Sequence, residues 1–423
     1  MEEGLIVGYD LCKDFCRISW LMEGREEPQD LVFSEEENPY LIQNSICRKK
    51  GEDVWLVGRE AYETALLGGG AIVDRLLRLV EKSGFSTIEG VKYTAEELLL
   101  HFLEETLEKL FRETKTRKVS QIMFSVQELD GPVLDAIIRC MHDLGYERSK
   151  IHIISHTESY LYYVLSQKRE LWSNISMLFD LSGDGLNYYE MEVLRGLQPN
   201  VAFAKRTFLE EGFSLEILDS LTGKKMADNI MTQCADRMLS KKLISSAYLS
   251  GNGMDKVQLW GDSFLRTLCN RRRVFFTENL FSRGAVYAAL EFLREKSAYP
   301  FRIMCEGRIG VDITMDVTSG VHQKTMTLCT AGMNWYESRA GFDIILDREN
   351  VLRLKVKKIG ERSPLTLEIP LTEFSGRPDR MSRINVSLLF TSEDVFNITL
   401  KDKGFGEFLP ATDTVIKRTF TVN

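Results

Sequence analysis

The sequence lacks several features that would assign the protein to a class at once. No apolar run approaches the roughly 20 residues of a membrane-spanning helix, and Glu2 and Glu3 stand where a signal peptide would carry positive charge. The net charge is −8 and no segment is strongly basic, which argues against a footprint for nucleic acid or an anionic membrane. We therefore expect a cytoplasmic protein that binds neither nucleic acid nor membrane.

The eight cysteines show no disulfide or metal-binding pattern. They are scattered along the chain, no Cys-x-x-Cys pair occurs, and no cluster of cysteine and histidine has the spacing of a zinc site. We interpret most of them as small buried side chains in a reducing compartment. With 423 residues, 44% of them hydrophobic, the chain is long enough for two or three cores.

Two apolar runs each reach an aspartate that is followed by a tight turn. The first run leads from Leu5 to Asp10, and the second leads from Met177 to Asp180. Such turns can direct backbone N–H groups at an anion while the carboxylate faces a cation. Either segment alone is also consistent with an ordinary strand end. Together they predict two halves of a site for a magnesium polyphosphate.

Strands alternate with helices over the first 297 residues, which predicts an α/β layer with mostly parallel strands. A capping box of Thr94 and Glu97 marks the start of a long helix that ends near Thr114. We also expect strands at 5–7, 121–126, 151–154, 176–179 and 247–249, and helices at 62–82 (interrupted by the glycines 68–70), 131–144, 158–166, 203–242 and 257–268. Ligands of such sheets lie at the carboxyl ends of strands, where Asp10 and Asp180 fall.

The period of the apolar residues changes to two after residue 300. Alternation is clear in the segments 351–356 and 384–390. This pattern predicts a separate all-β domain, with the junction at 296–300. We therefore expect one domain over residues 1–297 and a second over residues 298–423.

The order of these motifs resembles the actin-like ATPase superfamily, and within it the DnaK-type heat-shock chaperones. Gly8-Tyr9-Asp10-Leu11 stands where those proteins have their first phosphate loop, and Phe179-Asp180-Leu181-Ser182-Gly183-Asp184-Gly185 stands at the second. Ser250-Gly251-Asn252-Gly253 stands at the adenosine loop. Residues 57–61, 93–98 and 153–158 are similar to further family phrases, and residues 384–404 are similar to the closing strands of the chaperone β-sandwich.

The resemblance implies an α/β actin-like fold, which is a duplicated ribonuclease H-like nucleotide-binding fold, followed by a C-terminal all-β sandwich that binds a protein or peptide partner. It implies ATP and Mg²⁺ as ligands, with Asp10 and Asp180 at the metal. The implied nucleotide-binding set is Gly8, Asp10, Leu11, Cys12, Lys13, Asp180, Ser182, Gly183, Gly185, Gly251, Asn252 and Gly253.

The implied catalytic residues are Glu158, which would order the attacking water, and the pair Asp10 and Asp180. Glu158 is equally consistent with a helix-start carboxylate that the helix dipole favours. Arg75 is a candidate for the terminal phosphate, although a surface arginine is the commoner case. We interpret His156 as a satisfied loop histidine.

The chain also departs from the family pattern. Cys12, Lys13 and Asp14 replace a glycine and two threonines of the first loop, and Asp184 and Leu186 replace a glycine and a threonine of the second. The region 186–248 is shortened, which implies a reduced subdomain, and we expect no helical lid after the β domain. The loops keep the carboxylates but lose the hydroxyls, so weak ATP hydrolysis and no hydrolysis both remain open.

We therefore expect a divergent, chaperone-like ATP-binding protein in which nucleotide controls the binding of a partner at the β domain. Two alternatives remain. One is a catalytically inactive scaffold that keeps the actin fold for its surfaces. The other is an actin-like protein that forms filaments.

Overall fold

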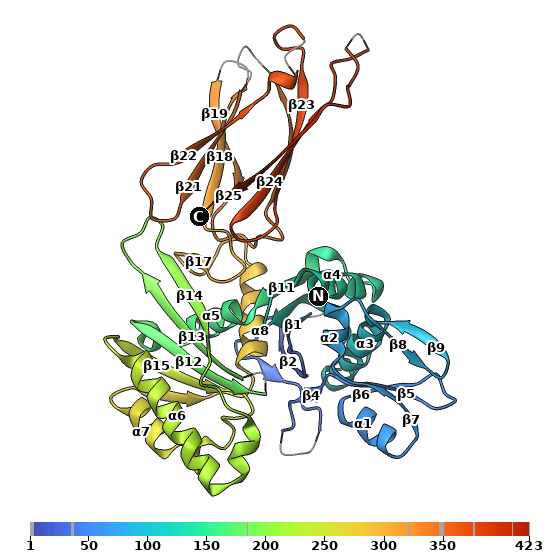
Figure 1. The fold of residues 1–423 in the computed structure, drawn as a ribbon, viewed down its shortest axis with the longest axis vertical. Coiled ribbons are helices and arrows are strands. Elements are labelled where there is room, and N and C mark those ends of the chain that lie inside the picture. The colour runs from blue at the N-terminus through green and yellow to red at the C-terminus, as the bar shows by residue number, and fades with distance from the viewer. Residues whose placement is uncertain are drawn as a thin grey trace. The chain divides into compact units, whose positions relative to one another are not determined.

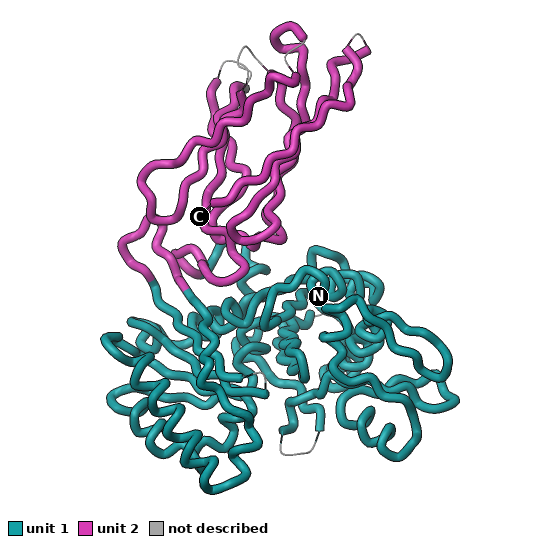
Figure 2. The backbone as a smooth tube through the Cα atoms, viewed as in Figure 1, with its two compact units in different colours: residues 1–193, 204–298 teal, residues 194–203, 299–423 magenta. Residues whose placement is uncertain are grey.

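The chain folds into two compact units in the computed structural model, which describes residues 4–34, 38–183, 185–319, 322–346, 351–374, 377–407 and 409–422. Unit 1 comprises residues 1–193 and 204–298, and unit 2 comprises residues 194–203 and 299–423 (Figure 2). Within the described part of the chain, no helix is both long and apolar enough to span a membrane.

Unit 1 contains the same succession of elements twice (Figure 1). The first half consists of β1 (Leu5–Leu11), β2 (Phe15–Met22), β3 (Gln29–Asp30), α3 (Ala95–Thr114), β10 (Val119–Val126), α4 (Gly131–Asp143), β11 (Ile151–Ser155) and α5 (His156–Ser166). The second half consists of β12 (Ile175–Ser182), β13 (Gly185–Leu194), β14 (Val201–Leu209), α6 (Leu221–Leu239), β15 (Ile244–Ser250), α7 (Asp262–Cys269), β16 (Arg273–Phe276) and α8 (Leu280–Phe292).

The two halves also share one sheet topology. The strand orders are β11-β10-β1-β2-β3 and β16-β15-β12-β13-β14, so the first strand of each half lies at the centre of its sheet. Each first strand pairs in parallel with one neighbour and antiparallel with its hairpin partner. Asp10 and Asp180 therefore occupy equivalent positions, opposite Ser125 and Ser250 on the parallel neighbours.

A smaller subdomain is inserted between β3 and α3. It consists of β4 (Ile42–Gln43), β5 (Ile46–Lys49), β6 (Trp55–Val57), α1 (Gly58–Leu66), β7 (Gly70–Val73), α2 (Leu76–Glu81), β8 (Phe85–Ile88) and β9 (Val91–Thr94). The helix predicted over 62–82 is therefore wrong in its middle, where β7 pairs with β5. A Cβ atom on Gly70 would lie 2.5 Å from the Arg48 carbonyl oxygen, so glycine permits this close pairing.

Of two further helix predictions, the start of one helix is confirmed and the first part of the other is wrong. The capping box is confirmed, because Glu97 N–H donates to Thr94 Oγ1 (3.2 Å) and Thr94 N–H donates to Glu97 Oε2 (2.7 Å). The helix predicted over 203–242 is wrong in its first part, which forms β14. Residues 203–209 instead pair with β13 and complete the second sheet, and their Phe203, Thr207 and Phe208 are residue types that suit a strand.

Helices α5 and α8 join the two halves of unit 1. Helix α8 belongs to the second half by sequence but packs on β1, β2 and α5 of the first. Two glycines permit this approach, since a Cβ atom on Gly8 would lie 2.0 Å from the Ser282 carbonyl oxygen and one on Gly284 would lie 2.1 Å from that of Ser159. In return, Tyr160 of α5 packs on Tyr189 of the second half, with ring centroids 5.8 Å apart.

Unit 2 is an all-β unit in which two four-stranded sheets share one apolar core. One sheet has the order β19 (His322–Cys329), β18 (Val311–Ser319), β21 (Val351–Lys358) and β22 (Leu365–Pro370). The other has the order β20 (Arg339–Ile345), β23 (Arg383–Phe390), β24 (Val395–Asp402) and β25 (Val415–Thr421). Strand β17 (Arg302–Met304) pairs with residues 201–203 of the same unit. Alternate residues of β23 are buried, as a strand with one face on a core requires.

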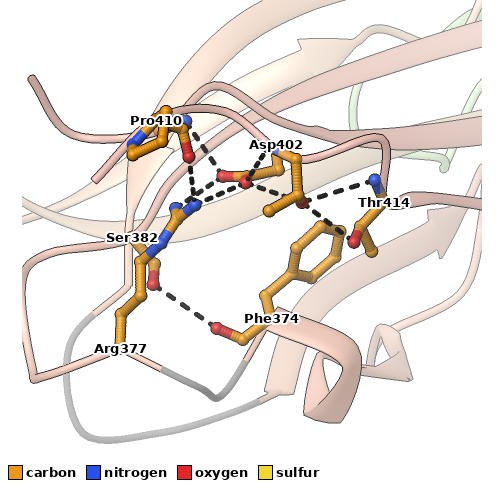
Figure 3. A network of polar contacts seen from close by, with 8 residues as sticks. Phe374, Arg377, Ser382, Asp402, Pro410 and Thr414 are labelled. Atoms are coloured by element: carbon orange, nitrogen blue, oxygen red, sulfur yellow. Dashed lines mark hydrogen bonds and ion pairs between the residues drawn. The ribbon is translucent and has the colours of Figure 1, made fainter. Parts of the chain in front are cut away.

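A buried carboxylate organises the loop that follows β24 (Figure 3). The Arg377 guanidinium donates to both oxygens of Asp402, each at 2.7 Å, and also to the Pro410 carbonyl oxygen. The backbone N–H groups of Gly404 and Thr412 donate to the same carboxylate at 2.9 and 2.8 Å. Burial alone would raise the pKa of Asp402, but the arginine and the backbone donors hold it well below its usual range.

Replacing Asp402 by asparagine should lower the free energy of unfolding of unit 2 by about 3 kcal/mol at neutral pH, because Arg377 would lose its buried partner. Because the pKa of Asp402 is lower in the folded state, its contribution to stability is fully present above the ordinary aspartate value of about 4 and is lost progressively as pH falls from there through the lower folded-state pKa. Urea denaturation at several pH values should therefore show the gap between wild type and Asp402→Asn narrowing in acid. The control is Asp413→Asn, at an exposed site. A gap that stays constant at low pH would contradict this account.

Candidate functional site

Several of the residues predicted from the sequence converge on one small cavity inside unit 1. Its volume is about 10 Å³, and its lining residues are Asp10, Cys12, Phe15, Arg17, Gln127, His156, Asp180, Ser182, Ser250, Gly251 and Phe281. Both sheets contribute to it, because β1 and β12 bring their aspartates to the same place. A space of this size holds about one water molecule, whereas small-molecule sites commonly have about 300–1,000 Å³.

Both aspartates lie inside strands and not at the start of the turns. Strand β1 continues to Leu11 and β12 continues to Ser182, so the predicted strand ends are corrected. The reason is hairpin pairing: Asp10 lies opposite Arg17 on β2, and Asp180 lies opposite Asn187 on β13. The first turn is closed by the Cys12 N–H group, which donates to the Phe15 carbonyl oxygen at 2.9 Å. That N–H group is therefore engaged within the hairpin.

His156 is the closest partner of Asp10 at this cavity. Its Nε2 atom lies 2.7 Å from Asp10 Oδ1 and 3.8 Å from Cys12 Sγ. The Cys12 thiol donates to the same carboxylate oxygen at 3.5 Å. Phe281 of α8 stacks on the imidazole ring, with centroids 3.9 Å apart and planes 10° from parallel. These contacts place a hydrogen-bonded cluster of three side chains where the sequence predicted a phosphate loop.

The thiol of this cluster is protonated at neutral pH. Burial is the main cause that raises the pKa of Cys12 well above its ordinary value, and the carboxylates of Asp10 and Asp180 raise it further. The opposing effect of Arg17 is smaller. As it stands, Cys12 is therefore neither a thiolate nucleophile nor an anion that could compete with a phosphate.

Arg17 spans the two halves of unit 1 beside the cavity. It is carried by β2 of the first half, and its guanidinium donates to the Glu278 carbonyl oxygen at 2.7 Å and to Asn252 Oδ1 at 3.1 Å. Both acceptors belong to the second half. Asn252, predicted to contact adenosine, thus holds an arginine of this chain. Charge-assisted bonds of this kind are stronger than neutral ones, so they close the halves on each other.

The three predicted residues Glu158, Arg75 and Lys13, which carry charged groups, are not among the residues that line the cavity. Glu158 is buried in the first turn of α5, where its N–H group donates to Ser155 Oγ at 3.1 Å. Arg75 is exposed at the residue before α2, in the left-handed backbone region. Lys13 is half-buried in the first turn. His156, for which the sequence predicts a loop position, instead begins α5 and faces Asp10.

The predicted glycines serve mostly to permit close packing. A Cβ atom on Gly251 would lie 2.2 Å from the Leu181 carbonyl oxygen, and one on Gly253 would lie 2.5 Å from Leu181 Cγ. Gly8 contacts α8, as described above, and Gly185 starts β13 with a φ of 114°. Only Gly183, of the predicted glycines, has open space around its Cα. Leu11 and Leu186 are buried, and Asp184 lies outside the described residues.

His156 is the residue that sequence reasoning missed, along with Arg17 and Phe281. A signal for His156 was present, because it follows directly on a buried strand and begins a helix, which is the usual place for ligands in α/β sheets. No local signal marks Arg17 or Phe281. They reach the cavity only because β2 and α8 pack across the two halves.

Comparison with known families returns two matches. Residues 27–306 match the model described as the C-terminal part of a family of unknown function (DUF5716). Residues 308–422 match a domain of unknown function (DUF8552). No curated protein matches the sequence.

The packing role of Gly8 can be separated from a phosphate-binding role by comparing two alanine substitutions. Gly8→Ala should lower the free energy of unfolding by about 2–3 kcal/mol, because the new methyl group would collide with the backbone of α8. Gly183→Ala should change it by less than about 0.5 kcal/mol, because nothing lies within 4 Å of the new atom. Urea denaturation of both variants measures the difference. Equal stability of the two variants would show that α8 does not require glycine at position 8.

Proposed function

This chain belongs to the DUF5716 family, and we propose that it is a non-catalytic interaction protein built on a duplicated actin-like fold whose cleft is too small for a nucleotide. The observation that carries this proposal is the cavity of about 10 Å³ at the convergence of Asp10, Asp180 and Gly251, where the resemblance implied a nucleotide. The chain's own side chains occupy that region.

The duplicated topology of unit 1 supports the actin-like assignment. Each half has the order β-β-β-α-β-α-β-α, and each sheet places its first strand between the fourth and the second. A duplicated ribonuclease H-like fold requires such a repeat, and the sequence resemblance had implied it. The equivalent positions of Asp10 and Asp180 agree with descent from one repeated unit.

Three contacts favour an interaction protein over an ATPase. Asp10 shares its Oδ1 atom between His156 and the Cys12 thiol, so the carboxylate is already engaged. The hydrogen bond from Arg17 to Asn252 links the two halves, and it would have to break before a ligand entered. The carboxylates alone would suit Mg²⁺, which prefers hard oxygen ligands. The space does not suit a magnesium nucleotide, and we derive no hydrolytic step.

Unit 2 offers surfaces on which a partner could bind. Strands β19, β22, β20 and β25 lie at the ends of the two sheet orders, and an extended peptide can add to such an edge through backbone hydrogen bonds. Leu365 at the start of β22 is 63% exposed and Val415 at the start of β25 is 43% exposed. We propose that a protein or peptide partner binds at one of these edges.

A second candidate function is nucleotide-controlled binding, in which the cleft opens to admit ATP with Mg²⁺. The observation that favours it is the equivalence of Asp10 and Asp180, since both carboxylates line the same cavity from opposite halves. In this case the contacts of Arg17 would break on opening, and closure would be the switch that a partner detects.

Titration calorimetry with ATP and Mg²⁺ distinguishes the two candidates. We expect no binding to the wild-type chain tighter than about 1 mM, which corresponds to about 4 kcal/mol, because the cavity of about 10 Å³ is far too small for a nucleotide. We expect the same for Arg17→Ala, because His156 and Cys12 still occupy the space beside Asp10. The control Arg273→Ala removes a surface arginine that pairs with Glu170.

Micromolar affinity in the wild type that is lost in Asp10→Asn would overturn the non-catalytic proposal in favour of the second candidate. Affinity that appears only in Arg17→Ala would also overturn it, because the cleft would then hold a complete nucleotide site behind one side chain.

A further inference from the structure

We propose that Asp10, Cys12 and His156 form a binding site for a divalent transition metal of the zinc type. One oxygen, one sulfur and one nitrogen ligand atom lie within 4.8 Å of one another in this cluster. The proposal goes beyond the proposed function and does not depend on it, because a single ion fits the cavity whether or not the cleft ever opens to a nucleotide.

The distances within the cluster are close to those of a tetrahedral zinc site. Bond lengths of about 2.3 Å to sulfur and about 2.0–2.2 Å to nitrogen and oxygen give ligand-to-ligand distances of about 3.5 Å from sulfur and about 3.3 Å between nitrogen and oxygen. Cys12 Sγ lies 3.5 Å from Asp10 Oδ1 and 3.8 Å from His156 Nε2. The nitrogen and oxygen are 2.7 Å apart, so they need to separate by about 0.6 Å.

The three side chains are held by rigid elements. Asp10 lies in the central strand β1, and His156 begins α5. Both backbone polar groups of Cys12 are hydrogen-bonded. Its N–H donates to the Phe15 carbonyl oxygen, and its carbonyl oxygen accepts from Asn44 Nδ2 at 2.5 Å. The exposed fractions of Asp10, Cys12 and His156 are 2%, 7% and 3%. Such preorganisation lowers the cost of assembling a metal site.

The ligand types favour a transition metal over magnesium. Thiolate and imidazole suit zinc and its neighbours, whereas magnesium requires oxygen ligands in an octahedral arrangement. The cavity of about 10 Å³ is about the size of one water molecule, so it has room for a single ion. Asp180 lines the same cavity and is the candidate for the fourth ligand, although its carboxylate would have to move closer to the other three.

The charges at the cavity balance when a divalent ion binds. The metal displaces the thiol proton, which leaves as H⁺, so Asp10, Asp180 and the Cys12 thiolate contribute three negative charges. The Arg17 guanidinium and the ion contribute three positive charges. Their sum is zero, which is the condition under which buried charges are tolerated.

The imidazole of His156 can bind a metal through Nε2 at the loss of one hydrogen bond, the one to Asp10. At present Nε2–H donates to Asp10, and the Nδ1 atom has no hydrogen-bond partner among the residues described. Moving the proton to Nδ1 exchanges the Asp10 hydrogen bond for a metal bond, and one ring nitrogen is without a partner in either tautomer. If Asp180 completes the site, the ion links β1 and α5 of the first half to β12 of the second.

Cobalt(II) is the probe for this site, because a cysteine thiolate bound to cobalt gives a charge-transfer absorption that oxygen and nitrogen ligands do not give. We expect the full-length wild-type chain, titrated in reducing buffer, to develop this band with one equivalent of Co²⁺. One equivalent of Zn²⁺ should then abolish the band. Both metals should also raise the thermal unfolding temperature, since they bind only the folded chain.

Two variants and a matched control assign the ligands. Cys12→Ser should remove the charge-transfer band, and Asp10→Asn should weaken cobalt affinity at least tenfold. Loss of a residue that only hydrogen-bonds to a metal ligand typically weakens metal affinity by about 10–100-fold, and loss of a ligand should cost at least as much. Cys16→Ser is the control, because Cys16 is equally buried nearby but contacts the Tyr9 hydroxyl. Circular dichroism checks that each variant folds. If Cys12→Ser does not fold, the loss of cobalt affinity in Asp10→Asn identifies the site.

The proposal is overturned if the wild type gives no charge-transfer band, if Cys12→Ser keeps it, or if Cys16→Ser loses it. These outcomes are separate from those of the ATP titration. If the chain binds ATP and also shows the cobalt band, only the non-catalytic proposal is refuted. If the chain binds no ATP and shows no cobalt band, only the metal site is refuted.

Discussion

The close approach of α8 to α5 and β1 is the contact on which the rest of unit 1 depends. It requires backbone atoms of two elements to come nearer than any Cβ atom would permit, and Gly8 and Gly284 supply that freedom. With α8 in this position, Phe281 reaches the imidazole of His156 and Ser282 meets Ser19, whose hydroxyl lies 2.7 Å away. The two sheets are thereby fixed so that their central strands bring Asp10 and Asp180 to one cavity.

Once the halves are fixed, the electrostatics of the cavity follow from burial. Two carboxylates lie out of water, and each needs a donor or a cation nearby. His156 and Cys12 serve Asp10, and Arg17 brings a positive charge on β2 while it bonds to the second half. The same side chains that satisfy the carboxylates fill the space that a nucleotide would need. A small cavity with a sulfur, a nitrogen and an oxygen ligand is a setting for a single ion and not for a large anion.

Local sequence patterns predicted those elements whose signals are local. The capping box at Thr94 and the apolar period of α3 came from neighbouring residues, and the structure confirms the helix. The same reasoning failed at residues 70–73 and 201–209, where strands form because sheets elsewhere offer partners. It also misjudged His156, because a histidine at a helix start has no intrinsic preference that reveals its neighbour. Cys12 and His156 are 144 positions apart, so no spacing rule for zinc sites could pair them.

The sequence by itself determined that Asp10 and Asp180 each follow an apolar run of strand length, that a helix begins at the capping box of Thr94, and that alternating residues dominate after position 300. These features depend on short-range periodicity and on residue type, and both can be read directly from the sequence. Only the tertiary structure decided that the aspartates face one small cavity, that Arg17 crosses to Asn252 and that Asp10, Cys12 and His156 meet. Those facts depend on how the two sheets dock, and docking is decided by glycine contacts and ring packing between residues far apart in the chain.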